Sequence, residues 1–202
     1  MTRQRKILAV LLLPFAGIIL NAARAEYLKP RNVGAQSMES AAQAGIRLRA
    51  DLSEKILYVE EDGKVVKTYS IADGTSNYPT PRGAFSIDKV VWNPAWVPPD
   101  SRWAKGKTPK EPGHPDNPMR LVKIFFKEPA YYIHGTDQVD TIGSAASHGC
   151  LRMDPLDAAE LAIRVMEAGG AKKDSSWFQN AIGRGETRTV LLPTKVQMVI
   201  TG

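Results

Sequence analysis

The sequence predicts a mainly β domain that follows an N-terminal export segment. From residue 46 onward, short segments rich in Val, Ile, Tyr and Phe recur between turn residues, and several alternate apolar with polar side chains. This alternation is the period of a strand with one buried face. Only the segment after residue 154 has a sustained helical period. The 202-residue chain would keep about 177 residues after removal of the export segment, enough for one domain with a full core.

The first 25 residues are typical of a secretory signal peptide. Basic residues at positions 3, 5 and 6 precede the apolar run Ile7 to Leu20, and Ala23-Arg24-Ala25 has the small residues of a cleavage site. The run is shorter than the roughly 20 residues that a membrane-spanning helix needs. We therefore expect an exported protein of the periplasm or cell envelope that begins near Glu26 and meets the membrane only through its signal.

The charge of the chain argues against nucleic-acid binding. The formal net charge is +6, but residues 1–25 hold four basic and no acidic residues. The remainder carries 23 Lys and Arg against 21 Asp and Glu. The mature protein is therefore near neutrality, and we expect no nucleic-acid partner.

Strand signals follow one another through the first half of the domain. Residues 46–52 alternate apolar and polar side chains, as a half-buried strand does. Residues 55–59 and 65–71 flank Asp62-Gly63, a strong hairpin signal. Turn residues then lead into a further strand at 84–92.

Residues 93–118 are predicted to form a long loop. They hold seven of the fourteen prolines and two of the four tryptophans, Trp96 and Trp103, without a regular period. Loops of this length inside a domain are often lids or binding loops. Either the loop covers the active site, or its tryptophans fasten it to the body of the domain.

The second half of the domain adds strands and one amphipathic helix. Residues 121–126 and 130–133 are predicted strands, and the second delivers His134 at its end. Asp154 is a suitable N-cap with a proline after it, and Gly169-Gly170 ends the helix. The helix has an apolar stripe of Leu156, Ala159, Ile163 and Met166, which is expected to pack on the core.

The chain closes with a polar stretch and a last strand. Residues 172–187 are polar, and residues 190–200 are strand-like. Pro193 interrupts this strand, which predicts an edge strand or a bulge.

The only cysteine, Cys150, lies in Ser147-His148-Gly149-Cys150, shortly after a second histidine, His134. A free thiol with a histidine base is what a cysteine nucleophile requires. A buried structural cysteine is the common alternative. The polar neighbours and Arg152, whose charge lowers a thiol pKa, favour a reactive thiol.

Each further role in cysteine catalysis has a candidate nearby. His134 is the expected base, and the Gly135 carbonyl could accept from its other ring nitrogen and orient the ring. The backbone N–H of Gly149 or Cys150 is the expected oxyanion donor, since glycine permits close approach of a substrate carbonyl. His148 either lines this donor pocket or has a structural role.

These residues resemble the L,D-transpeptidase family with a YkuD-type catalytic domain. The resemblance covers roughly residues 46–170, and its parts follow the order of the family. They are Asp62-Gly63, Thr80-Pro81-Arg82-Gly83, Asn117-Pro118, Ile133-His134-Gly135-Thr136, Ile142-Gly143 and Ser147-His148-Gly149-Cys150-Leu151-Arg152. Each part alone is weak, whereas the ordered set is specific.

The resemblance implies a β-sandwich or barrel-like domain with Cys150 in a groove. It also implies that the thiol attacks the third residue of a peptidoglycan tetrapeptide stem, releases D-alanine, and passes the acyl group to an amine of a second stem. Water as acceptor would give a carboxypeptidase, and an amine of a wall-attached lipoprotein would give protein attachment. Ser147, Arg152 and Thr136 are implied as substrate-binding or supporting residues. Such enzymes typically need no metal or cofactor.

The predicted organisation has four segments. A signal peptide at 1–25 and a linker at 26–45 precede the catalytic domain at 46–170, and residues 171–202 form a C-terminal extension with the final strand. Two positions inside the catalytic domain depart from the family pattern. Arg82 stands where smaller residues are frequent, and Arg120 stands where a glycine is frequent.

Other interpretations remain open. A sortase also combines His, Cys and Arg, but Arg152 follows Cys150 more closely than is usual there, and papain-like enzymes usually place the cysteine before the histidine. A zinc site of His114, His134, His148 and Cys150 matches no compact zinc spacing. A wall-binding module that keeps the fold without catalysis is the alternative from another class.

Overall fold

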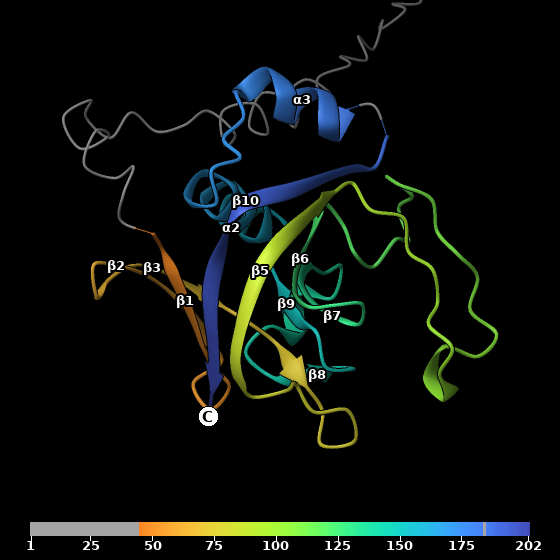
Figure 1. The fold of residues 1–202 in the computed structure, drawn as a ribbon. Helices are drawn as coiled ribbons and strands as arrows, with labels where there is room; N and C mark the ends of the chain where they lie inside the picture. The colour runs from red at the N-terminus through yellow and green to blue at the C-terminus, as the bar shows by residue number, and fades with distance from the viewer. Residues whose placement is uncertain (1–44, 184) are drawn as a thin grey trace, which may run out of the picture. The chain divides into compact units, whose positions relative to one another are not determined.

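The computed structural model describes residues 45–183 and 185–202, so the predicted signal peptide and nearly all of the predicted linker lie outside the described residues. The described chain is mainly β, as predicted (Figure 1). Its strands are β1 (Arg47–Asp51), β2 (Ile56–Glu61), β3 (Lys64–Ser70), β4 (Asp73–Gly74), β5 (Gly83–Trp92), β6 (Val122–Lys127), β7 (Tyr131–Gly135), β8 (Ala145–Ser147), β9 (Leu151–Met153) and β10 (Arg188–Thr201). Its helices are α2 (Pro155–Ala168), α3 (Ser175–Gly183) and the short 3-10 turns η1 (Arg102–Ala104) and η2 (Val139–Thr141).

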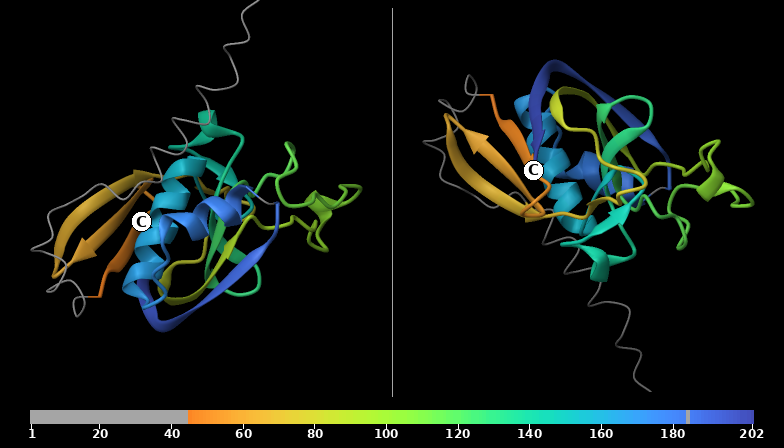
Figure 2. Two further views of the ribbon diagram at one scale, coloured as in Figure 1. Left: turned by 90° about the horizontal axis from the view of Figure 1, so that it is seen from above. Right: turned by 90° about the horizontal axis from the view of Figure 1, so that it is seen from below.

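Eight of the described strands form one sheet in the order β3-β2-β1-β10-β5-β6-β7-β9. The sheet curls into a nearly closed barrel, and α2 packs against β6, β7 and β10 (Figures 1 and 2). The short strands β4 and β8 form a separate parallel pair. Among the described residues, none of the helices has the length and apolar character needed to cross a membrane.

The predicted hairpin is confirmed in β2 and β3, which pair antiparallel. Asp62 and Gly63 both have positive φ values, 50° and 74°. Two successive residues with positive φ form the turn whose twist matches that of the flanking strands. In the neighbouring strand β1, Leu48 and Ala50 are fully buried between more exposed residues, as its alternation predicts.

Helix α2 begins and ends where the sequence predicts. The Asp154 side chain accepts a hydrogen bond from the Leu156 N–H at 2.8 Å, and Gly169 is the C-cap. The buried face of α2 differs in part from the predicted stripe. Ala159 and Met166 are buried as predicted, whereas Leu156 and Ile163 are only half-buried. The buried residues are Ala158, Ala159, Leu161, Ala162, Val165 and Met166.

Of the two alternatives predicted for the last strand, the bulge is confirmed, and the strand lies inside the sheet rather than at its edge. β10 lies between β1, its parallel partner, and β5, its antiparallel partner. The register with β5 shifts between Leu191 and Val196, so Pro193, which has no N–H to donate, falls in the irregular segment. The segment after residue 170 therefore supplies a central strand of the same sheet.

The polar stretch before β10 contains a helix, α3, that the sequence pattern did not predict. The Asp174 carboxylate caps α3 by accepting from the Trp177 N–H at 2.8 Å. On the inner side of α3, Phe178 lies 5.1 Å from the ring of the buried Trp92, and Trp177 lies 6.3 Å from it. Two aromatic anchors on nine residues are too few to produce a helical period in the sequence.

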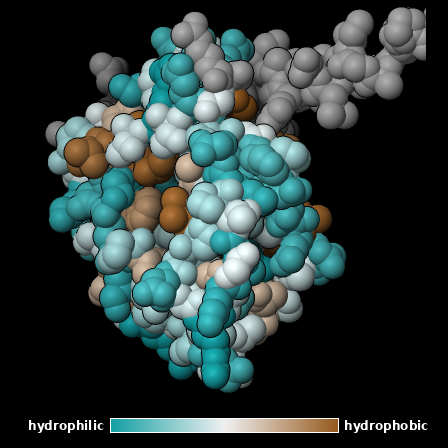
Figure 3. Space-filling view, turned by 90° about the vertical axis from the view of Figure 1, so that its right-hand side faces the viewer, coloured by the Kyte–Doolittle hydropathy of each residue, from teal (hydrophilic) through white to brown (hydrophobic). Residues whose placement is uncertain are grey.

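The predicted long loop runs from β5 to β6 and projects from the sheet (Figures 1 and 2). The buried Asn117 closes the loop on itself, since its amide donates to the carbonyls of Pro94 at 2.8 Å and Glu111 at 3.1 Å. Trp96 and Lys110 bond to each other through their backbones. The molecular face on this side is mostly hydrophilic, with smaller apolar patches (Figure 3).

Candidate active site

Three neighbouring strands, β6, β7 and β9, bring the predicted residues to one face of the sheet. In the parallel β7–β9 ladder His134 lies beside Arg152, and in the antiparallel β6–β7 ladder it lies opposite Lys123. Residues paired across strands point to the same face. Cys150 comes directly before β9, two residues from Arg152, so the strand alternation directs it to this face too. Residues far apart in the sequence thus share one surface.

His134 is buried, with 3% of its surface exposed, and its ring has a defined orientation. Nδ1 lies 2.6 Å from the Gly135 carbonyl oxygen, the contact expected from the sequence. Because a carbonyl only accepts, Nδ1 carries the proton and Nε2 keeps its lone pair. Burial, and after it the charges of Arg152 and Lys123, lower the pKa of His134 to about 3 against the opposing effect of the Gly135 and Pro118 carbonyls. The imidazole is therefore neutral at neutral pH.

The Cys150 thiol is free and partly exposed. It donates to the Ala130 carbonyl at 3.4 Å. Burial raises the thiol pKa, whereas hydrogen bonds from Tyr132 and the charges of Lys123 and Arg152 oppose that rise. The resting site consequently holds a neutral thiol and a neutral imidazole rather than an ion pair.

Ser147 shapes the loop that carries the thiol. Its buried hydroxyl donates to the Cys150 carbonyl at 2.6 Å and accepts from the Gly149 N–H at 3.0 Å. Of the two expected oxyanion donors, the Gly149 N–H is therefore already engaged, which leaves that of Cys150. Gly149 has φ +105°, and a Cβ there would lie 2.8 Å from the Tyr131 ring. Only glycine fits this position without strain.

Close packing requires a glycine at position 135. A Cβ at this position would lie 2.8 Å from the Cα of Pro155 and 3.1 Å from the Cβ of Arg120. Arg120 itself has φ +52°, the conformation for which glycine is favoured, and this explains why glycine is frequent there. The Arg120 side chain donates to the Pro115 carbonyl at 2.8 Å, so it anchors the end of the long loop.

Thr136 acts on Arg152 through an intermediate residue. The buried Thr136 hydroxyl accepts from the Gln138 N–H at 3.1 Å. The Gln138 side-chain oxygen in turn accepts from the Arg152 guanidinium at 3.0 Å. Thr136 is thus a support for the loop that holds Arg152.

His148 is exposed and lies between two aromatic rings. Trp103 of the long loop stacks on it at 4.0 Å between centroids with an 18° interplanar angle, and Tyr78 lies at 4.7 Å. Partial burial, Arg152 and Lys107 lower the pKa of His148. This arrangement supports the structural interpretation of His148. It also brings the long loop to the segment that carries Cys150, while Trp96, 7% exposed, fastens the loop elsewhere.

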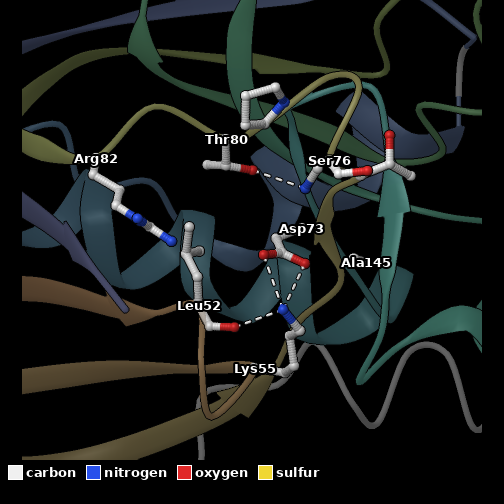
Figure 4. Close-up of a pocket in the computed structure, with 10 residues that line it drawn as sticks. Leu52, Lys55, Asp73, Ser76, Thr80, Arg82 and Ala145 are labelled. Atoms are coloured by element: carbon white, nitrogen blue, oxygen red, sulfur yellow. Dashed lines mark hydrogen bonds and ion pairs between the residues drawn. The ribbon is translucent and has the colours of Figure 1, made fainter.

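Thr80 is linked to the segment that carries Cys150 through Gly74. Thr80 accepts from the Gly74 N–H at 2.9 Å, and Gly74 pairs with Ser147 between β4 and β8. Beside this turn lies a cavity of about 480 Å³, lined by ten residues that include Arg82 and the ion pair of Lys55 with Asp73 (Figure 4). Neither catalytic candidate lines it.

The zinc alternative finds no support in the geometry. In the part of the chain that the structure describes, no group of three or more His, Cys, Asp or Glu side chains could hold a metal ion. The His114 ring accepts from the Asp116 N–H at 3.0 Å within the long loop.

Three residues of this face were not singled out from the sequence: Lys123, Tyr132 and Gln138. Tyr132 lies two residues before His134, and its ring is 5.5 Å from the imidazole. Lys123 lies on the preceding strand, with its ammonium 4.9 Å from the Tyr132 ring. The period of two could have revealed Tyr132, whereas Lys123 and Gln138 required the strand register and the loop conformation.

The chain belongs to the L,D-transpeptidase family. The family model of the YkuD L,D-transpeptidase catalytic domain matches residues 45–196, which continues past the predicted boundary at residue 170 and into β10. The mainly β fold and the order of the motifs agree with this assignment.

Curated relatives include two candidate L,D-transpeptidases of Bacillus. YqjB of Bacillus subtilis is 35% identical over 97 residues, covering 46% of this chain and 50% of that protein. YkuD of Bacillus licheniformis is 33% identical over 119 residues, covering 59% of each chain. The chain thus spans about half to three fifths of the length of these relatives.

Among solved structures, an L,D-transpeptidase from Mycobacterium smegmatis is similar at 18% identity with a TM-score of 0.49. The match covers 79% of this chain and 59% of that one.

Proposed function

We propose that this protein is a peptidoglycan L,D-transpeptidase in which Cys150 is the nucleophile and His134 the general base. The observation that carries the proposal is the 2.6 Å contact between His134 Nδ1 and the Gly135 carbonyl. It leaves Nε2 unprotonated on the face to which the strand alternation directs the thiol. Family membership supports the reaction class.

The proposed reaction has two balanced half-steps. In the first, the thiol proton moves to His134, the sulfur bonds to the carbonyl carbon of the third stem residue, and the Cys150 N–H faces the developing oxyanion. The bond to D-alanine then breaks, and the proton leaves with its amine. In the second, an acceptor amine attacks the thioester, gives its proton through His134 to the sulfur, and frees the enzyme.

The substrate and location follow from the same proposal. Stem peptides of peptidoglycan are the proposed donor and acceptor, and an amine of a wall-attached lipoprotein is a further acceptor for the same thioester. The site would then work in the periplasm or cell envelope, reached through the signal predicted at residues 1–25.

Product analysis by mass spectrometry tests the proposal. The purified protein and its Cys150→Ala variant are incubated with tetrapeptide muropeptides. We expect dimers and free D-alanine with the wild type and neither with the variant. Tripeptides without dimers would identify water as the acceptor, and unchanged muropeptides with folded wild-type protein would refute the peptidoglycan donor.

The role of His134 is tested separately. His134→Gln keeps a polar side chain of similar size but removes the base. Retention of near-normal D-alanine release in this variant would contradict the assigned role.

A further inference from the structure

A partly buried lysine lies on the face of the proposed nucleophile. Lys123 stands opposite His134 in the β6–β7 ladder, and its ammonium donates to the Ala95 carbonyl at 3.3 Å. An ammonium has three donors, and among the described residues the Ala95 carbonyl is its one acceptor. No carboxylate is paired with it in the described part of the chain. A desolvated cation with spare donors stabilises an anion placed beside it.

Tyr132 lies beside both this lysine and His134. The Lys123 ammonium lies 4.9 Å from its ring centroid, so the cation is held against the ring face. The Tyr132 ring also meets Phe125 at 5.1 Å and His134 at 5.5 Å, which fixes its position. Hydrogen bonding from the backbone and side chain of Tyr132 lowers the pKa of the Cys150 thiol.

The charged and titratable groups on this face come from three strands. Lys123 comes from β6, Tyr132 and His134 from β7, and Arg152 from β9. Arg152 is partly committed, because it donates to Gln138 and interacts with the charge of Asp137. Lys123 interacts electrostatically with Cys150, and no carboxylate of residues 45–183 or 185–202 forms an ion pair with it.

We propose that Lys123 and Tyr132 form an anion-stabilising wall of the Cys150 site, Lys123 through its charge and Tyr132 through its hydroxyl. The inference rests on the proposed function in that Cys150 is the nucleophile. The wall stabilises negative charge on the sulfur as the proton leaves for His134. Burial raises the pKa of the thiol, and Lys123 and Tyr132 lower it again. This matters because the resting thiol and His134 are both neutral, so no charged imidazole is present to stabilise the thiolate.

The test measures the thiol itself, without any wall substrate. Cys150 is the only cysteine, so the rate of alkylation by iodoacetamide between pH 5 and pH 10 reports its pKa in the full chain. Lys123→Met should raise that pKa by about one unit and slow alkylation at pH 7 about tenfold. Lys123→Arg should restore most of the rate.

Two further variants complete the test. Lys127→Met is the matched control, because Lys127 lies on the same face of β6 but is exposed near Tyr131, and it should leave the thiol pKa unchanged. Tyr132→Phe removes one oxygen and keeps the ring, and it should slow alkylation about threefold through the loss of one hydrogen bond. Thermal unfolding of each variant checks the fold.

Unchanged thiol pKa values in folded Lys123→Met and in Tyr132→Phe would overturn the inference. An equal shift in Lys127→Met would also overturn it, since the effect would then be one of general charge. If Lys123→Met does not fold, Lys123→Arg and Tyr132→Phe decide the question. A shifted thiol pKa in a protein that leaves muropeptides unchanged would refute the proposed function but not this wall, so the two failures are distinguishable.

Discussion

The two faces of strands β6, β7 and β9 carry different side chains, although alternating residues of the same strands form both. On the inner face, Ile124, Ile133 and Leu151 are fully buried in the apolar core. On the outer face, Lys123, His134 and Arg152 alternate with them. Because successive side chains of a strand point to opposite faces, one run of sequence meets a packing requirement and a chemical one at the same time.

This comparison separates stability from reactivity at adjacent residues. Ile133 contributes to the core, and His134, its direct neighbour, lies on the opposite face with Lys123 and Arg152. The rigid inner face holds the outer groups in place, since the strands cannot shift by one residue without exposing the core. Substitutions on the two faces should therefore have different consequences.

The largest expected effect is on turnover from the outer face. His134→Gln should lower the rate of acylation about 100- to 10,000-fold, because the general base is lost. Its unfolding temperature should stay close to that of the wild type or rise slightly. Kinetics of D-alanine release, measured beside thermal unfolding, check this prediction, and a large fall in stability would show that His134 belongs to the packing instead.

The neighbouring inner residue should show the reverse pattern. Ile133→Ala should destabilise the fold by about 2–5 kcal/mol, because it leaves a cavity in a fully buried layer. Denaturant unfolding gives the change, and thiol alkylation of the remaining folded protein should proceed at the wild-type rate. A loss of thiol reactivity without a loss of stability in Ile133→Ala would contradict the separation of the two faces into a packing face and a reactive face.

The buried His134 also predicts a loss of stability in acid. Its pKa is about 3 in the folded state and roughly 6.5 in an unfolded chain. Below about pH 6.5 the unfolded state therefore binds a proton that the folded state rejects, and stability falls as the pH decreases toward 3. Unfolding free energies measured from pH 7 to pH 4 should fall less steeply in His134→Gln. If unfolding free energy depends on pH equally in the wild type and in His134→Gln, His134 is not held neutral in the folded state. The pH dependence that remains in His134→Gln comes from His148 and the carboxyl groups.

Two glycines offer a smaller and more exact comparison. Gly149 and Gly143 both have positive φ values, +105° and +91°, but a Cβ at Gly149 would meet Tyr131 while one at Gly143 would meet open space. Gly143→Ala should cost about 1–2 kcal/mol from backbone strain alone. Gly149→Ala should cost about 2–4 kcal/mol because of the added clash, and it should also slow thiol alkylation. Equal costs in thermal unfolding would show that the cysteine segment yields to the clash.

The sequence predicted the local elements well where the signal was local. The Asp62-Gly63 hairpin, the Asp154 cap and the glycine end of α2 depend on a few neighbouring residues, and all are confirmed. Helix α3 and the central position of β10 were missed. Trp92 stabilises α3 from 85 residues away in sequence, and β10 finds its neighbours β1 and β5 only in the folded sheet.

The sequence by itself determined the mainly β class, the ordered motifs of an L,D-transpeptidase domain and the pair of candidate residues, Cys150 and His134. These depend on residue types and short spacings, which a linear chain displays directly. Only the tertiary structure decided that Lys123 shares their face, that Ser147 engages the Gly149 N–H, and that Trp103 stacks on His148. The physical reason is strand register, together with loop conformation. Both depend on long-range packing, and a period of two shows which residues alternate without showing which strand lies beside which.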